Sequence, residues 1–124
     1  MNIYLSHSAS FAYDLLAIAA IKARRNPDND EAKGNLMVLD NDIQQQVGIL
    51  HHEQVCASQE YHDLLRVNDE MYVAIDELNA KGEMHGMATY INDRVHQRYV
   101  AKGALQKVWF PGTGLSEQKF GYSK

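Results

Sequence analysis

The sequence of 124 residues contains one cysteine, two prolines and no long uninterrupted apolar run. The lone Cys56 excludes an intrachain disulfide and a zinc site made of several thiolates. The longest mainly apolar run, Phe11 to Ile21, is interrupted by Asp14 and is shorter than the roughly twenty residues needed to span a bilayer. A secretory signal would place basic residues ahead of this run, whereas Lys22 follows it. We therefore expect a cytoplasmic protein without membrane contact.

The composition is typical of one globular domain covering residues 1–124. Apolar residues make up 45% and charged residues 23% of the chain, which favours neither a disordered nor a fibrous protein. The formal net charge of -4 is unevenly distributed, because residues 1–91 hold six basic and fourteen acidic side chains and residues 92–124 hold six basic and two acidic ones. We expect the acidic body and the basic end to attract each other, within one chain or between two.

Apolar residues three and four positions apart predict a series of helices with short breaks between them. The first helix is expected to start after Ser8 or Ser10, whose hydroxyl oxygen can accept a backbone N–H, and to end before Pro27. The second helix is expected to be capped by Asp28 or Asn29. Its apolar positions keep helical spacing: Leu36, Leu39, Ile43, Val47 and Leu50.

The later breaks are signalled by glycine and serine. Gly48 either lies within the second helix or ends it, since glycine costs about 1 kcal/mol in a helix interior. The third helix is expected to begin after Ser58 and to end at Lys81 and Gly82. The last helix is expected to run from about Met84 to Trp109. One of its faces carries Met87, Ile91, Val95 and Tyr99, and a basic row lies beside that face: Arg94, Arg98 and Lys102.

This succession of helices predicts an all-α fold, either antiparallel helical hairpins or a four-helix bundle. Residues 1–8 are expected to form a short extended arm, and residues 9–110 the helical body. Residues 111–124, which are rich in Gly, Ser and Lys, are expected to form an irregular tail.

Histidine, cysteine and carboxylate side chains are densest between His51 and His62. His52 and Cys56 would share one helix face if the helix is unbroken there. The segment contains no Glu-x-x-His repeat and no His-Glu-x-x-His motif of the kinds found in di-iron and zinc proteins. We therefore favour packed or solvated polar residues over a metal site, for which His52, Cys56 and Glu60 are the candidate ligands, and we expect no cofactor.

Acids on the third predicted helix suggest an alternative, a metal-dependent phosphate or nucleotide hydrolase. Magnesium prefers oxygen ligands, and the candidate carboxylates are those of Glu60, Asp63, Asp69 and Asp76. All-helical nucleotide pyrophosphatases pair a Glu-x-x-Glu with a Glu-x-x-Asp segment, whereas this chain has Glu60-x-x-Asp63 without the other half. A solvated helix face is the simpler interpretation. In the hydrolase alternative, Arg94 or Lys102 would stabilise phosphate charge.

The basic C-terminal region, residues 94–124, is the basis of a third interpretation. Together with the basic row, Lys119 and Tyr122 are residue types that contact phosphates and stack on bases. Nucleic-acid binders usually carry a more basic domain than a chain whose formal charge is -4. Protein contacts are therefore favoured over nucleic acid.

Asn68 interrupts the apolar stripe of the third helix. A buried polar side chain without a partner costs on the order of 1–3 kcal/mol. Asn68 therefore either forms a helix–helix hydrogen bond that fixes the register of two helices or lies on the floor of a polar pocket with Asp76 and Arg94. The first interpretation is favoured.

Short patterns in a fixed order resemble a family of small uncharacterised all-helical proteins from bacteria and phages. The patterns are Tyr13 to Ile18 leading to Ile21 to Arg25, Leu65-x-x-Asn68 followed by Asp76, Asn92-x-Arg94, and Glu117 to Tyr122. The stretch from Gly48 to Ser58 has no counterpart in that family. The resemblance implies a helical fold and no particular activity. The binding candidates combine residues of these patterns with the basic row: Asn68, Asp76, Asn92, Arg94, Arg98, Lys102, Lys119 and Tyr122.

Taken together, these features predict a non-catalytic binding or assembly protein that acts as a homo-oligomer. A few amphipathic helices with exposed tyrosines and methionines can bury more apolar surface by pairing. The acidic helices of one subunit would meet the basic last helix or tail of another chain. An unidentified protein would be the further partner.

Overall fold

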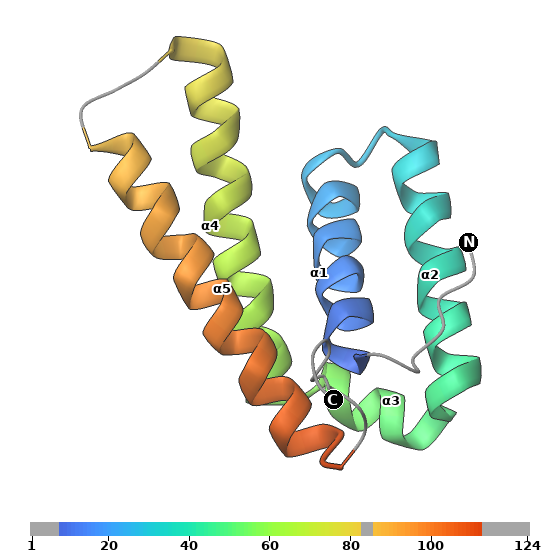
Figure 1. Ribbon diagram of the computed structural model, residues 1–124. Coiled ribbons are helices and arrows are strands. Elements are labelled where there is room, and N and C mark those ends of the chain that lie inside the picture. Colours follow the sequence, from blue (N-terminus) through green and yellow to red (C-terminus); the bar gives the residue numbers. More distant parts are fainter. Residues whose placement is uncertain (1–7, 83–85, 113–124) are drawn as a thin grey trace.

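In the computed structural model, residues 8–82 and 86–112 are described, and these residues form five helices and no strand. Their order is α1 (Ala9–Arg25), α2 (Asp30–Val47), α3 (Ile49–Cys56), α4 (Gln59–Lys81) and α5 (Met87–Trp109). α1 and α2 form one antiparallel hairpin, α4 and α5 form a longer one, and the short α3 connects them (Figure 1). The predicted all-α fold of antiparallel hairpins is confirmed. Most of the predicted arm and tail, residues 1–7 and 113–124, lies outside the described residues.

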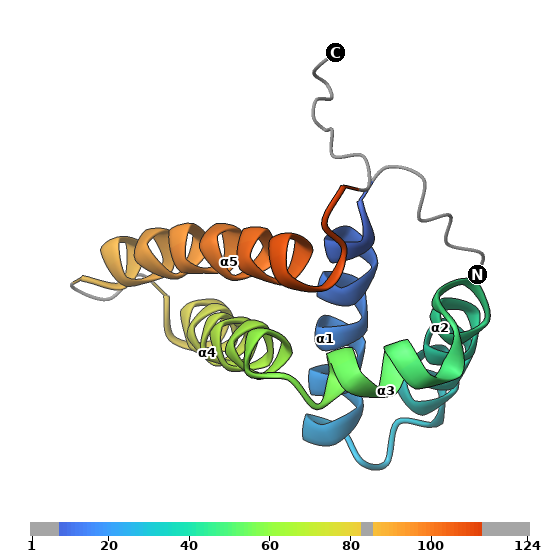
Figure 2. The same cartoon turned by 90° about the horizontal axis from the view of Figure 1, so that it is seen from below.

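α1 is the central helix of the core. Figure 2 shows it between α2 on one side and the α4–α5 hairpin on the other. Its buried surface combines small and large apolar side chains: Ala12, Tyr13, Leu16 and Ala17. They pack against Leu39 and Ile43 of α2, Leu64 of α4 and Leu105 of α5. α1 needs apolar residues on more than one side because it packs against α2 and against both helices of the other hairpin, α4 and α5. No described helix is both long and apolar enough to cross a membrane.

The predicted N-caps Asn29 and Ser58 are confirmed, and α1 begins directly after Ser8, one of its two predicted starting points. Asn29 accepts a hydrogen bond from the backbone N–H of Ala32 at 3.0 Å, and Ser58 accepts one from Tyr61 at 3.2 Å. Ser8 occupies the N-cap position of α1, but its hydroxyl makes no capping hydrogen bond. The backbone N–H of Ser10 instead donates to the side-chain oxygen of Gln106 on α5 at 3.0 Å. A backbone N–H at the start of α1 is therefore satisfied by a side chain of α5 and not by the N-cap residue.

Glycines separate the helices at two points. Gly48 ends α2 and precedes α3 with a φ of 100°, a conformation that side chains with a Cβ rarely adopt. This settles the question left open by the sequence, because the helix does not continue from Val47 to Ile49. The last helix begins at Met87, after Gly86, and not near Met84 as predicted. Residues 83–85 lie outside the described residues.

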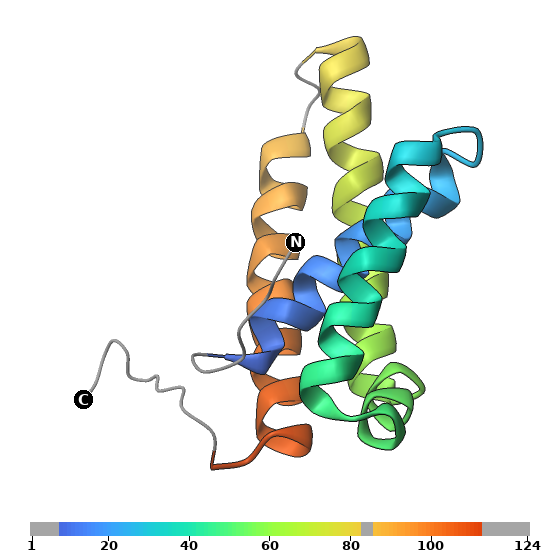
Figure 3. The ribbon, with the colours of Figure 1, turned by 90° about the vertical axis from the view of Figure 1, so that its right-hand side faces the viewer.

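The α4–α5 hairpin extends beyond the other helices, as Figures 1 and 3 show. Burial on α4 stops at Ala74, and burial on α5 starts at Ala101. Residues 75–81 and 87–100, which we call the distal hairpin, therefore contain no fully buried residue among those the structure describes. The proximal half of the same hairpin packs on α1 and forms part of the core.

Candidate functional site

Asp14 is a buried charge where α1 meets α4 and α5. Its side chain is 1% exposed. Arg98 of α5 donates from Nε to both carboxylate oxygens at 3.1 Å and from Nη2 to Oδ2. Asn68 of α4 donates to Oδ1 at 2.9 Å, and Lys102 Nζ lies 4.0 Å from Oδ2. A buried carboxylate needs a counter-ion and filled hydrogen-bond positions, and Arg98 with Asn68 provides both. The bond to Asp14 raises the pKa of Arg98, which keeps the guanidinium charged.

The helix–helix hydrogen bond predicted for Asn68 is present. Its amide joins α4 to α1 through Asp14, and it also donates to the backbone oxygen of Leu64 at 3.1 Å. The alternative pocket with Asp76 and Arg94 is not assembled, because Asp76 is exposed and Arg94 binds Glu70. Asn68 therefore links α4 to α1.

The basic row of α5 turns toward its own chain. Arg94 Nε lies 2.7 Å from Glu70 Oε1 on α4, and its guanidinium sits 4.2 Å from the ring centre of Tyr90. Arg98 and Lys102 face Asp14. The expected attraction between the acidic body and the basic end thus forms within one chain. The same rotation of α5 leaves part of its predicted apolar face outside, with Val95 48% and Tyr99 75% exposed.

A second ion-pair group ties the end of α1 to α4. Arg25 donates to Asp69 through Nε at 2.6 Å and through Nη2 at 2.9 Å, and Arg24 Nη2 lies 2.8 Å from the same carboxylate. The hydrogen bond from Arg25 holds the pKa of Asp69 below its usual value. The basic residues that end α1 therefore serve a tertiary contact as well as a helix terminus.

His52 bridges α1 and α2 from its position on α3. Its Nδ1 lies 2.7 Å from the hydroxyl of Tyr13, and its Nε2 lies 2.7 Å from Asp40 Oδ1. The Asp40 carboxylate accepts from Nε2, and the Tyr13 hydroxyl forms the second hydrogen bond of the ring with Nδ1. The histidine and tyrosine rings are 3% and 0% exposed. This chain of hydrogen bonds satisfies the buried polar atoms of Tyr13 and His52 and ends at Asp40, whose side chain is 47% exposed.

The candidate metal ligands are only partly brought together. Cys56 Sγ lies 3.7 Å from His52 Nε2, as expected for one face of an unbroken α3. Burial raises the pKa of the Cys56 thiol to about 11, so the thiolate that binds metals is disfavoured. The Glu60 carboxylate accepts a hydrogen bond from Trp109 Nε1 at 2.9 Å. Among the described residues, no three His, Cys, Asp or Glu side chains are placed to hold a metal ion.

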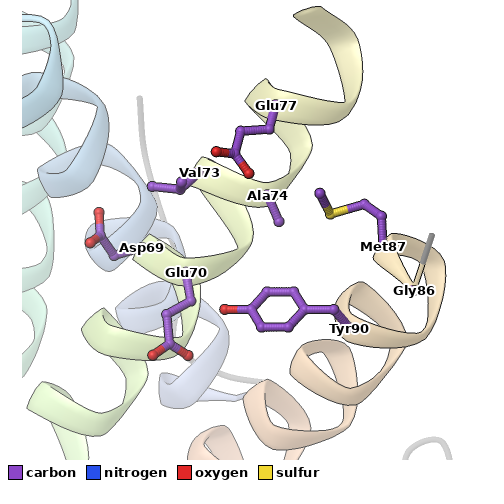
Figure 4. A pocket seen from close by; sticks show the side chains of 8 residues that line it. All are labelled: Asp69, Glu70, Val73, Ala74, Glu77, Gly86, Met87 and Tyr90. Carbon is purple, nitrogen blue, oxygen red and sulfur yellow. The ribbon is translucent and has the colours of Figure 1, made fainter. Parts of the chain in front are cut away.

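A pocket of about 490 Å³ lies between α4 and α5. Figure 4 shows Tyr90 reaching from α5 toward Glu70 of α4, with Met87 on the same side as Tyr90. The full lining is Asp69, Glu70, Val73, Ala74, Glu77, Gly86, Met87 and Tyr90. Two of its carboxylates, Asp69 and Glu70, are already paired with arginines. The pocket is therefore less acidic than its lining suggests.

The remaining binding candidates do not join these clusters. Asn92 is exposed on the distal hairpin, and Lys119 and Tyr122 lie outside the described residues. Sequence reasoning missed Asp14 and the link from Tyr13 through His52 to Asp40. Asp14 did carry a signal, since an acid inside an apolar helical run must find a partner when that helix is buried. The His52 link had no comparable signal, because its three residues come from three separate helices.

Comparisons with protein-family models, curated proteins and solved structures found no match to this chain. The resemblance to small helical proteins of bacteria and phages therefore rests on short sequence patterns alone. The function has to be argued from the geometry of the molecule.

Proposed function

We propose that this chain is a non-catalytic binding or assembly protein that acts as a homo-oligomer. The observation that carries the proposal is the exposure of large apolar side chains around α5. Only Ala101 and Leu105 of this helix are buried, whereas five of its apolar residues are between 38% and 75% exposed: Tyr90, Val95, Tyr99, Val100 and Val108. A helix that is apolar beyond its packed stripe is typical of one that packs against more than its own chain.

The engagement of the reactive side chains supports a non-catalytic role. Asp14 is paired with Arg98, and His52 is held between Tyr13 and Asp40. A general acid or base must reach a substrate proton, and these buried groups already bind one another. These contacts hold α1 against α5 and α3 against α1 and α2, which is a structural role.

Three of the four carboxylates of the hydrolase alternative are similarly engaged, and the fourth, Asp76, is exposed on α4. Glu60 accepts from Trp109, Asp63 accepts from Gln59 at 2.8 Å, and Asp69 binds two arginines. Magnesium would have to displace these donors to gain oxygen ligands. This favours binding over metal-dependent hydrolysis.

The arginines on which the nucleic-acid alternative depends are also engaged within the chain. Arg94 and Arg98 neutralise carboxylates of their own chain, so neither presents an unpaired charge to a phosphate backbone. Protein surfaces, including a second copy of the chain and an unidentified protein partner, fit the exposed apolar residues better.

Light scattering coupled to size-exclusion chromatography tests the proposal. We expect the full chain to give a mass that is a multiple of the single-chain mass and that falls on dilution between about 100 and 1 µM, a range suited to complexes of moderate affinity. A single-chain mass at every concentration would refute the homo-oligomer.

A further inference from the structure

We infer that two copies of this chain associate through their distal hairpins, residues 75–81 and 87–100, as an antiparallel four-helix bundle about a two-fold axis near Val95. The inference rests on the proposed homo-oligomer and names its interface. Two antiparallel helix pairs that meet face to face form the usual up-and-down bundle. The four helices would be α4 and α5 of each copy.

The distal hairpin has an apolar face that the chain leaves uncovered. α1 makes its outermost contacts with α4 at Asp69 and Tyr72, through Arg25 and Asn26. Beyond these contacts the buried stripe of α4 runs on into Ile75, which is 41% exposed. The stripe is spaced for packing along the whole helix, but α1 ends before it does.

On α5 too, one line of side chains, which we call the seam, runs from the part covered by α1 into the exposed distal part. Ala88, Asn92, Val95 and Tyr99 follow one another at intervals of four, three and four residues, the spacing of helices that pack side by side. The seam continues through Lys102 and Gln106, which contact Asp14 and Ser10 of α1. α1 thus covers the proximal part of the seam, and its exposed distal part is shaped to receive another helix.

Charge favours a second copy as the occupant. The whole chain has a formal charge of -4, so two copies repel each other over much of their surface. The distal seam itself carries no charge, and the neighbouring Arg94 and Arg98 are neutralised by Glu70 and Asp14. The distal hairpin as a whole holds Asp76, Glu77 and Asp93 against Lys81, Arg94 and Arg98, so it is formally neutral and two copies can meet there without net repulsion.

The antiparallel orientation follows from the shape of the molecule. The distal hairpin projects from one end of the α1–α3 body (Figure 1). An antiparallel pair of hairpins keeps the two bodies at opposite ends, whereas a parallel pair brings two acidic bodies side by side. Val95 lies at the middle of the seam and therefore nearest the axis. Asn92 would act as the single polar residue that fixes helix register at some cost in stability.

The contact is small. Residues 88 to 99 span about 17 Å of helix, and two helices side by side are about 20 Å wide. Their product is about 340 Å², less than half of the about 800 Å² that each partner buries in a standard interface, so the contact belongs with weak and transient interfaces. We expect the dimer to dissociate at about micromolar concentration.

A matched pair of variants tests the interface. Val95 on α5 and Val38 on α2 are 48% and 47% exposed, so glutamate at either position perturbs an isolated subunit to a similar extent. We expect Val95→Glu to give the single-chain mass at concentrations where the unmodified chain and Val38→Glu are dimeric. Circular dichroism of both variants checks that the helices are retained.

Cysteine cross-linking provides a second measurement that does not depend on disrupting the dimer. In a Cys56→Ser background, Val95→Cys should form a disulfide-linked dimer under mild oxidation, because equivalent residues near a two-fold axis approach within disulfide distance. Val38→Cys, the control, should stay monomeric on a denaturing gel. Equal cross-linking at the two positions would overturn the interface.

The outcomes separate the interface from the proposed function. An oligomer that survives Val95→Glu overturns the distal-hairpin interface and leaves the homo-oligomer standing. An oligomer lost in Val38→Glu but kept in Val95→Glu moves the interface to α2. A single-chain mass for the unmodified protein overturns both.

Discussion

Replacing Arg98 by methionine tests whether the Asp14 cluster holds the two hairpins together. The variant keeps a long side chain but removes the donors that bind the Asp14 carboxylate at 3.1 Å. Removing one partner of a buried pair typically costs 3–5 kcal/mol. Because Arg98 is 32% exposed and because Asn68 and Lys102 remain near Asp14, we expect the lower end, about 3 kcal/mol.

This loss is large for a domain whose total stability is about 5–15 kcal/mol. Urea denaturation followed by circular dichroism measures the free energy of unfolding, and we expect the melting temperature to fall by about 10–15 °C. Arg66→Met is the control, since Arg66 is 54% exposed and its pair with Glu70 spans 3.4 Å. Such a surface pair contributes about 0.5 kcal/mol or less.

A second substitution tests the cause of the effect. In the Asp14→Leu, Arg98→Met double variant no buried charge is left unpaired, so the loss should be smaller than the sum of the two single losses. If Arg98→Met costs no more than Arg66→Met, or if the two losses at the cluster simply add, the Asp14 cluster does not hold the helices as argued.

Three further predictions concern substitutions at single positions and are checked by denaturation. Tyr13→Phe removes the hydroxyl that is hydrogen-bonded to the buried His52 Nδ1 and should cost about 1–2 kcal/mol; an unchanged stability would contradict the hydrogen-bonded link. Gly48→Ala should destabilise the protein, because Gly48 has a φ of 100°, whereas Gly34→Ala inside α2, with open space at its Cβ, should stabilise it by about 0.5–1 kcal/mol. Burial raises the pKa of Cys56 from 9.0 to about 11, so the folded state keeps a proton that the unfolded chain releases; this stabilisation is present below about pH 9 and is lost as the pH rises through about 11. Melting temperatures should therefore fall over that range less steeply in Cys56→Ala, and parallel curves would refute the role of the thiol.

Local sequence determined where most helices begin and end. Asn29 and Ser58 can cap a helix through their own side chains, and Pro27 cannot continue one. These signals act within a few residues, so the start of α2 and both bounds of α4 could be read without tertiary information, whereas the end of α2 at Gly48 could not. The spacing of apolar residues along α4 likewise identified its packed side, and the place of Asn68 in that stripe indicated that its amide needs a partner on another helix.

Tertiary structure decided which side of α5 faces inward. By apolar spacing alone, Met87, Ile91, Val95 and Tyr99 form a plausible packed face, yet Val95 and Tyr99 are exposed. The basic row turns inward because Asp14 is buried on α1 and needs a counter-ion, and Arg98 supplies it. The sequence by itself determined most of the helices and the caps of α2 and α4, which depend on neighbouring residues. Only the tertiary structure could show the pairing of Asp14 with Arg98, 84 positions apart, and the apolar seam that this pairing leaves on the outside.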